Sequence, residues 1–336
     1  MIRTSLVAIG LLLSGSPAFG FGAAGHHAVC EIAYRVLTPD VRGTVDQILR
    51  ADGDERFFSF GAACGWPDRH DLFGPIVREY GPDHYINVPR GSVDASTCVD
   101  KDGPTNRCLL TTIPRMVRVL QGLDTDKLGR RDLGYPNDKT EAIRFLGHWL
   151  GDIHQPLHVS YGDDRGGNDL PVYGVRGCSS RDDKDLDGDG DTSEQVSSLH
   201  KVWDTCIVED SMSERGFRTG TDDRTPYAET LFNEITDSQR ALWSAVVWSA
   251  GPDSQVWPAA IASESYAIAQ SGPVQYCVAT GGQCWYAPGV QVHKKEEPFR
   301  IMQLSEEYED VHRMTVETRL KQAGVRLGVL LNRVLQ

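Results

Sequence analysis

Several features are missing from this sequence of 336 residues. It has no run of about twenty apolar residues, the length that a membrane-spanning helix needs, so no membrane span is expected. It has no Cys-x-x-Cys pair, so a zinc site built from cysteines is not expected. It has no Asn-x-Ser/Thr sequence, so N-linked glycans are not expected either. Internal repeats and low-complexity linkers are also absent from the sequence.

Positive charge is scarce. The chain has 34 lysines and arginines against 47 aspartates and glutamates, which gives a formal net charge of −13 at pH 7. A broad basic face that binds polyanions is therefore not expected, because affinity for phosphates otherwise relies on Lys and Arg. If the substrate carries phosphates, bound metal ions can supply the positive charge locally.

The first twenty residues have the pattern of a secretory signal. Arg3 is their only charged residue, an apolar run extends from Leu6 to Leu13, and small residues follow. Cleavage after Gly20 and cleavage after Ala18 both satisfy the small-residue rule. We expect export to the periplasm or the medium, and loss of Arg3 makes the net charge of the exported chain −14.

The cysteine count is even, and in an oxidising compartment this predicts disulfides. Two pairs are close enough in sequence to close short loops, namely Cys98 with Cys108 and Cys277 with Cys284. The spacing leaves open how the other four cysteines pair: Cys30, Cys64, Cys178 and Cys206.

Helical periodicity dominates the chain. Apolar residues recur at intervals of three and four over five segments, separated by Pro and Gly clusters: 26–50, 109–123, 139–155, 226–249 and 302–335. Strand signals are few, and no change in composition marks a domain boundary. The sequence predicts a mainly α fold in a single multi-helix domain over residues 21–336, after a signal peptide over 1–20.

Residues 161–198 form a segment rich in Gly and Asp. Within it four aspartates alternate around Gly190 with the spacing of a calcium-binding loop: Asp185, Asp187, Asp189 and Asp191. The twelfth position is Val196 rather than Glu, and no helix pair flanks the loop. A calcium site and a solvated acidic loop are both left open.

Three of the chain's ten histidines fall in the twelve residues GHWLGDIHQPLH, 147–158. His148 and Asp152 are four apart, so on a helix they share one face and can hold one metal ion. His200 and Asp204 repeat this spacing, and His158 adds a fifth nitrogen or oxygen ligand of the kinds that zinc accepts. A single histidine is weak evidence, but two such pairs favour a metal site. His154 lies off the shared face and is expected to have a structural role.

A set of motifs along nearly the whole chain resembles the zinc-dependent S1/P1 nucleases, whose helical fold is shared with bacterial zinc phospholipase C. The motifs are FGAAGH (21–26), WPD (66–68), HYINVP (84–89), HWLGDIHQPLH (148–158), RGGND (165–169), LHKVWD (199–204) and AGVRLGVLLN (323–332).

The resemblance implies three zinc ions at the bottom of a cleft. It assigns the first to Asp68, His84, His148 and Asp152, and the second to His158, His200 and Asp204. The third would be held by His26, Asp152 and the backbone amine and carbonyl of the mature first residue. Family members begin five residues before the first ligand histidine, which here implies Phe21 and cleavage after Gly20.

The implied activity is hydrolysis of single-stranded nucleic acid, DNA or RNA, by an endonuclease that can also act as a 3′-nucleotidase and is expected to be a monomer. Asp68 and Asp152 are the candidate catalytic carboxylates. Tyr85 is expected to stack on a base and Asn87 to hydrogen-bond it, although a core role for Tyr85 is equally open. The family often has Arg or Lys three residues after the first ligand aspartate, whereas this chain has Asp71.

Two alternatives belong to other functional classes. A zinc phospholipase C would use similar ligands, but its last ligand is usually Glu rather than Asp204, and its last two histidines are closer than the 42 residues that separate His158 from His200. A non-catalytic zinc-binding protein would result if Asp71 and the 161–198 segment closed the cleft.

Overall fold

The computed structural model describes residues 21–69, 80–89, 92, 94–100, 102–123, 139–173, 197–274, 279–280, 283–284, 302–305 and 307–336. The described part of the chain is mainly helical, which confirms the predicted fold class. Four features discussed above lie outside it: the segment 1–20, Asp71, the four calcium-loop aspartates, and Cys178 with Cys277. None of the described helices is both long and apolar enough to cross a membrane.

The α-helices are α1 (Gly22–Val36), α2 (Pro39–Arg50), α3 (Phe60–Ala63), α5 (Leu109–Leu120), α6 (Lys139–Asp152), α7 (Leu199–Lys201), α8 (Ile207–Glu214), α9 (Arg224–Asn233), α10 (Asp237–Trp248), α11 (Val256–Ala269) and α12 (Tyr308–Val334). Single turns of other helix types are η1 (Glu55–Phe57), η2 (Trp66–Asp68), η3 (Gly81–His84), η5 (Pro156–His158), η6 (Val202–Cys206), η7 (Thr221–Asp223) and η8 (Gly272–Val274).

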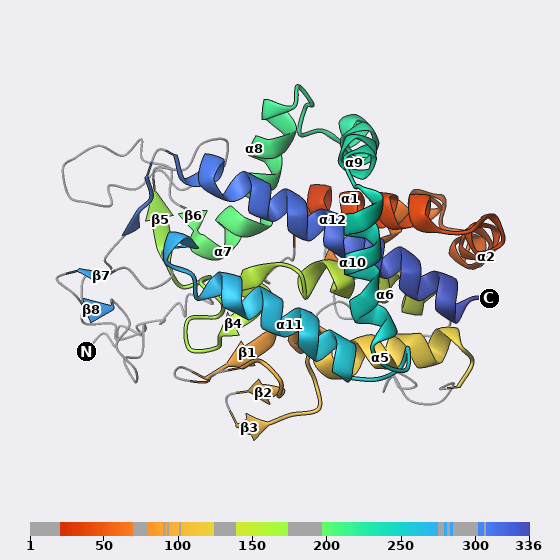
Figure 1. Ribbon diagram of the computed structural model, residues 1–336, viewed down its shortest axis with the longest axis horizontal. Coiled ribbons are helices and arrows are strands. Elements are labelled where there is room, and N and C mark those ends of the chain that lie inside the picture. Colours follow the sequence, from red (N-terminus) through yellow and green to blue (C-terminus); the bar gives the residue numbers. More distant parts are fainter. Residues whose placement is uncertain are drawn as a thin grey trace, which may run out of the picture.

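The strands are short: β1 (Ile86–Val88), β2 (Val99–Asp100), β3 (Gly103–Pro104), β4 (Val159–Tyr161), β5 (Pro171–Tyr173), β6 (Ser197–Ser198), β7 (Ala279–Thr280), β8 (Gln283–Cys284) and β9 (Met302–Gln303). Strands β5 to β8 lie toward the end of the molecule away from the C-terminus, and β1, β2 and β3 lie along its lower edge in Figure 1. The pair that matters for the site is β1 with β4, which run parallel with Ile86 opposite Val159 and Asn87 opposite Ser160.

The periodic segments form helices, with differences that have local causes. The segment 26–50 is two helices, because Thr38 is extended (ψ 155°) ahead of Pro39. The segment 226–249 divides where Thr236 caps α10 in a capping box with Gln239. Helix α11 was not predicted, because its sequence is apolar or small on most sides and has little helical periodicity.

The long helix α12 crosses the molecule and packs along α1, with α6, α8 and α10 also against it (Figure 1). Two glycines one turn apart on α12 allow the close approach to α1. A Cβ atom at Gly324 would lie 2.5 Å from the Ile32 side chain and 2.9 Å from the Val29 carbonyl oxygen, and one at Gly328 would lie 2.6 Å from the Val36 side chain. The α1–α12 packing therefore depends on the absence of these side chains.

Disulfides fix the segments beside α6. Cys98 bonds Cys108, as the spacing predicts, and Cys30 of α1 bonds Cys64 after α3, a pairing that the sequence left open. Cys206 is also disulfide-bonded. The side chains of the proposed Cys277–Cys284 pair lie outside the described residues.

We expect Gly324→Ala to lower the free energy of unfolding by about 1–3 kcal/mol, because the added methyl group forces α1 and α12 apart. Gly43→Ala on α2 is the matched control, since no atom lies within 4 Å of its Cβ position. This control should be neutral or stabilise by about 0.5–1 kcal/mol through helix propensity. Urea unfolding of both variants checks the prediction, and equal midpoints would contradict it.

Candidate metal centre

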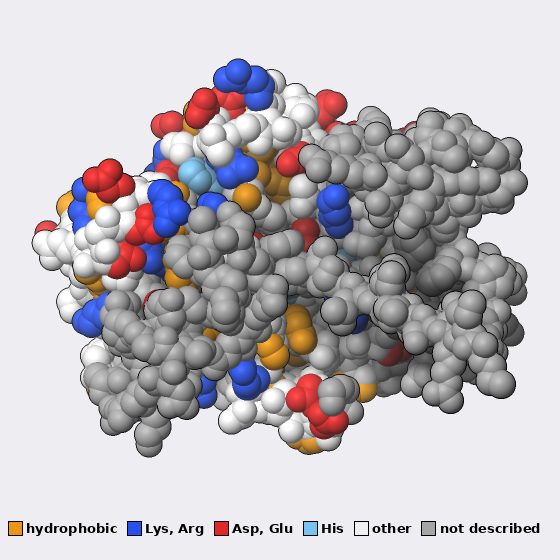
Figure 2. All heavy atoms as spheres, turned by 180° about the vertical axis from the view of Figure 1, so that it is seen from behind, with side chains coloured by type: hydrophobic (Ala, Val, Ile, Leu, Met, Phe, Trp, Pro, Cys, Tyr) orange, Lys and Arg blue, Asp and Glu red, His pale blue; other side chains and the backbone are white. Residues whose placement is uncertain are grey.

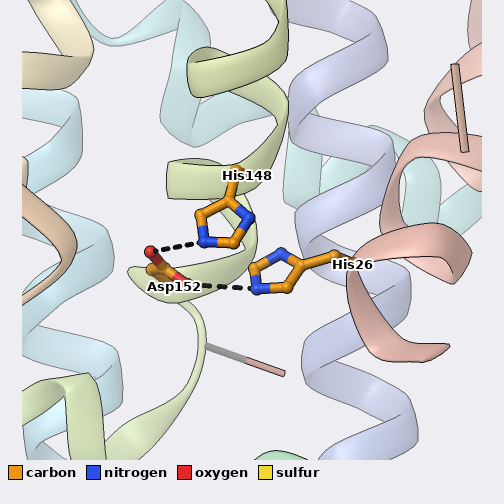
Figure 3. A group of neighbouring side chains, drawn as sticks. All are labelled: His26, His148 and Asp152. Carbon is orange, nitrogen blue, oxygen red and sulfur yellow. Dashed lines mark ion pairs between the residues drawn. The ribbon is translucent and has the colours of Figure 1, made fainter. Parts of the chain in front are cut away.

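The end of α6 brings together a buried carboxylate and a buried imidazole. Asp152 Oδ2 lies 3.4 Å from His148 Nε2 on the same helix, and Asp152 Oδ1 lies 3.3 Å from His26 Nε2 of α1. Figure 3 shows the three side chains pointing toward one another, with the two imidazole rings stacked at 3.6 Å. Gly151 permits this approach, because a Cβ atom there would lie 2.7 Å from His26 Nδ1.

A second group shares His148. His84, at the end of η3, places its Nδ1 atom 3.0 Å from Asp152 Oδ2 and 3.1 Å from His148 Nε2. Asp68, at the end of η2, places Oδ1 3.5 Å from His148 Nε2. The ligand atoms of Asp68, His84 and His148 lie close enough together to hold one metal ion.

A third group lies between η5 and η6. Asp204 Oδ2 is 3.2 Å from His200 Nε2, and Asp204 Oδ1 is 3.6 Å from His158 Nε2. Asp204 stands in a π-helical turn, a rare conformation that occurs often at functional sites. His158 Nδ1 is 3.9 Å from Asp152 Oδ1, so this group adjoins the other two.

Backbone carbonyls fix the orientation of three of the imidazole rings. The Nδ1 atoms of His148, His158 and His200 lie 2.8, 2.6 and 2.7 Å from the carbonyl oxygens of Cys64, His84 and Gly166. Each Nδ1–H therefore donates to a carbonyl, which leaves the Nε2 atom of each ring directed into the centre.

Two of these Nε2 atoms face one another. His158 Nε2 and His200 Nε2 are 3.1 Å apart, a distance that requires a proton or a metal ion between the two nitrogens. Both nitrogens of His26 and both oxygens of Asp152 are buried and make no hydrogen bond of normal geometry. Buried polar atoms are normally satisfied, so these unpaired nitrogen and oxygen donors fit metal ions of the zinc type.

The pKa shifts in the centre follow from burial and mutual charge. Burial raises the pKa of Asp68 well above its ordinary value, and the charges of Asp152 and Asp204 raise it further. Burial opposes the ionised form of Asp152, yet His148, His158 and the other neighbouring histidines hold its pKa well below the ordinary value. Burial also lowers the pKa of His148 strongly. Asp152 is thus a carboxylate and His148 a neutral ring, the forms that bind metal.

His158 has the opposite shift. Burial disfavours its charged form, but Asp152 and Asp204 raise its pKa to about 10. Without another cation, a proton on this ring offsets the charge of the carboxylates around it. A divalent ion would take over that role and displace the proton.

Gln155 is a member of the site that sequence reasoning missed. It is fully buried, its Nε2 donates to Asp204 Oδ1 at 2.5 Å, and its Oε1 accepts from the Leu157 N–H at 2.5 Å. Gln155 thereby caps η5, which carries His158, and orients a carboxylate from another segment. The available signal was its place in HQPLH, between two histidines and immediately before a proline.

His154 faces away from the three groups. Its Nδ1 lies 2.6 Å from the Leu150 carbonyl oxygen, and its Nε2 accepts from Arg326 Nη1 at 2.8 Å. Arg319 donates to the His154 carbonyl oxygen at 3.0 Å. These contacts attach the end of α6 to α12.

The two candidate nucleotide-binding residues lie beside His84. Tyr85 precedes β1 and is partly exposed, and burial raises the pKa of its phenol. Asn87 is partly exposed on β1, and a Cβ atom at Gly162 would lie 2.9 Å from its Cγ atom. Tyr85 is not part of the closed hydrophobic core.

A model of the S1/P1 Nuclease family matches residues 21–336. The chain belongs to the S1/P1 nuclease family. It is 28% identical to Endonuclease 3 of Arabidopsis thaliana over 98% of this chain and 93% of that protein. It is 29% identical to Endonuclease 2 of the same plant over 61% of each chain, and 24% identical to Nuclease P1 of Penicillium citrinum over 69% of this chain and 72% of that protein.

Membership in this family makes the chain a nuclease, a phosphodiester hydrolase whose substrate is nucleic acid. The family is zinc-dependent, and the described residues supply three groups that can hold a metal ion. Together these groups contain all eight predicted ligand side chains: His26, Asp68, His84, His148, Asp152, His158, His200 and Asp204. Phe21, the remaining predicted ligand, is buried at the start of α1, and its carbonyl oxygen accepts the Gly25 N–H at 2.9 Å.

We expect Gln155→Leu to weaken zinc binding by the His158, His200 and Asp204 group by about 10- to 100-fold, the usual effect of removing a hydrogen bond that orients a ligand. Gln47→Leu, exposed on α2, is the matched control and should bind zinc normally. Competition with a chromophoric chelator measures both affinities. Normal affinity in Gln155→Leu would show that Asp204 needs no such support.

Proposed function

We propose that this chain is an exported, zinc-dependent endonuclease that hydrolyses single-stranded nucleic acid with a cluster of three zinc ions, and that it also removes 3′-phosphates. The observation that carries the proposal is the carboxylate of Asp152. It is fully buried, each of its oxygens faces a histidine from a different segment, and neither oxygen makes a normal hydrogen bond. Such a carboxylate is suited to bridge two cations.

The donor sets support an assignment for each ion. Asp68, His84, His148 and Asp152 would hold the first; His158, His200 and Asp204 the second; and His26, Asp152 and the amine and carbonyl of Phe21 the third. Gly22 has a left-handed φ of 48°, and a Cβ atom there would lie 3.0 Å from the Asp204 carbonyl oxygen. The proposed N-terminal residue would therefore adjoin the chain segment that carries a ligand of the second ion.

When bound, zinc ions of such a cluster lower the pKa of water to near neutrality and neutralise the charge on phosphate oxygens. The chain's own contribution is to hold the Asp152 carboxylate ionised and the His148 ring neutral in a buried site. The Asp68 side chain is 13% exposed, whereas that of Asp152 is fully buried. We assign Asp68 the orientation of the attacking water and Asp152 the bridging role.

The preference for single strands would come from Tyr85 and Asn87. Both are partly exposed beside His84, so a base can stack on the Tyr85 ring while the Asn87 amide hydrogen-bonds the edge of that base. Stacking on an aromatic side chain contributes about 1–3 kcal/mol per base and needs a base that is not already paired and stacked in a duplex. The chain would act as a monomer, and its disulfides agree with export to an oxidising compartment.

We expect Asp152→Asn to lose two of three zinc ions and almost all activity, because the amide removes the charge that both ions share. Chelation of the unmodified protein should abolish activity and lower the melting temperature, since the ligands join several helices. Metal analysis with kinetics on single-stranded DNA, RNA and phosphatidylcholine checks this. A zinc-to-protein ratio of one or less in fresh protein, or a preference for the lipid, would refute the proposal.

Asn87→Ala is the companion variant to Asp152→Asn. It should retain full zinc content and mainly raise KM or change base preference, because the amide lies outside the metal groups. Equal loss of kcat and zinc in both variants would argue against the separation of metal binding from base binding.

The proposed third ion depends on a free amine at Phe21. A protein that retains one extra residue before Phe21 has an amide nitrogen there, which binds zinc poorly. It should fold, retain the two zinc ions that have only side-chain ligands, and cleave single-stranded DNA much more slowly. The comparison is with protein cleaved after Gly20, and full zinc content with full activity in the extended form would make Phe21 only a packing residue.

A further inference from the structure

The loop between β4 and β5 joins the candidate base-binding strand to the metal centre. At its start, Gly162 lies against the Asn87 side chain. At its middle, the Gly166 carbonyl oxygen accepts from His200 Nδ1 at 2.7 Å, and a Cβ atom at Gly166 would lie 2.5 Å from the Leu157 carbonyl oxygen. The residues between these two glycines are thus held between Asn87, the candidate base-binding residue, and His200, a candidate metal ligand.

Arg165 stands at this central point in a strained conformation. Its φ is 55°, and within the described part of the chain no other non-glycine residue has a positive φ. The loop over-determines that conformation: the Arg165 N–H donates to the Gly162 carbonyl at 3.3 Å, Asn168 Nδ2 donates to the Arg165 carbonyl at 2.9 Å, and the Gly166 N–H donates to the Tyr161 carbonyl at 2.9 Å. Strain held by its surroundings in this way is characteristic of functional positions.

The guanidinium of Arg165 is available to a ligand. Its side chain is 49% exposed, and its ion pair with Asp169 is long, with Arg165 Nη1 3.3 Å from Asp169 Oδ1. The Asp169 side chain is 9% exposed, so the pair is open to solvent on the guanidinium side. The guanidinium is also near enough to Tyr85 to lower the pKa of the phenol, against the larger effect of burial.

The Arg165 guanidinium is a positive charge in a protein whose net charge is negative. The net charge is −13, and among the coloured side chains in Figure 2 the Lys and Arg side chains are interspersed with Asp and Glu. Position 71, where the family often has a basic residue, is an aspartate. A polyanionic strand that reaches this site therefore depends on a few well-placed cations besides the metal ions.

We propose that Arg165 binds a backbone phosphate of the nucleic acid strand, next to the nucleoside held by Tyr85 and Asn87, and exchanges its ion pair with Asp169 for that phosphate. The planar guanidinium can donate two parallel hydrogen bonds to phosphate oxygens, which a lysine ammonium cannot. The inference rests on the proposed nuclease function. Arg165 would set affinity for the strand, while the metal centre performs the hydrolysis.

The test compares Arg165→Asn with Arg165→Lys. Asn tolerates a left-handed conformation, so it removes the charge and keeps the loop, whereas Lys keeps the charge and loses the paired donors. Arg218→Asn is the matched control, because Arg218 is an exposed arginine paired with Asp223 at 3.2 Å outside the site. Each protein is assayed on a single-stranded oligonucleotide and on bis(4-nitrophenyl) phosphate, which has one phosphate and no neighbouring nucleotide.

For Arg165→Asn we expect a KM for the oligonucleotide about 10-fold higher, with unchanged zinc content and unchanged kcat on the small diester. Binding of a non-hydrolysable phosphorothioate oligonucleotide, followed by fluorescence anisotropy, should weaken by the same factor. The slope of log K against log salt should fall by about 0.7, the value for one lost phosphate contact on a single strand. Arg165→Lys should restore the slope but only part of the affinity, and Arg218→Asn should match the unmodified protein.

Unchanged binding and salt slope in Arg165→Asn would overturn the proposal. Loss of zinc or of small-diester hydrolysis in that variant would also overturn it, because the loop would then serve only to hold His200. Failure of the nuclease proposal is distinguishable, since the unmodified protein would then neither cleave the oligonucleotide nor bind its phosphorothioate form.

Discussion

The buried charge of Asp152 is the constraint on which the arrangement of the helices depends. A carboxylate without water must be surrounded by cations or donors, and here these come from α1, η3 and η5 as well as from α6 itself. To bring them within reach, α6 has glycines on successive turns. A Cβ atom at Gly151 would meet the His26 ring, and one at Gly147 would overlap the Cys30–Cys64 disulfide. The metal centre and the closest helix packing are therefore one structural feature.

A second buried network, formed by residues of α11 and α12, contacts the C-terminal end of α6. Ser265 donates to the Ile153 carbonyl oxygen at 2.5 Å, and Arg319 donates to the His154 carbonyl, so the two carbonyls after Asp152 are satisfied by α11 and α12. Burial lowers the pKa of Arg319 to about 10, which still leaves it charged at neutral pH beside Glu264. Glu264 also pairs with Arg326, so removal of Glu264 would leave two buried arginines of α12 without their carboxylate partner beside the end of α6.

Sequence reasoning succeeded where the cause was local. The four-residue spacing of His148 and Asp152 places both on one face of α6, as helix geometry requires, and the Cys98–Cys108 pair closes a short loop. It failed where the cause was distant. Gln155 gains its role from Asp204, which is 49 residues away, and Gly151 from His26 on another helix. Helix α11 has apolar or small residues on most sides, so its own sequence does not show which sides are buried.

The carboxylates of the centre repel one another, and this repulsion joins metal binding to stability. Burial raises the pKa of Asp68, and the charges of Asp152 and Asp204 raise it further, while His158 Nε2 and His200 Nε2 lie 3.1 Å apart. Each of these contacts is unfavourable without a cation and favourable with one. Bound metal ions would therefore stabilise the folded chain by joining η2, η3, α6 and η6. Metal ions bound here would offset these carboxylates and would also attract the phosphates of a polyanion to a protein whose own net charge is negative.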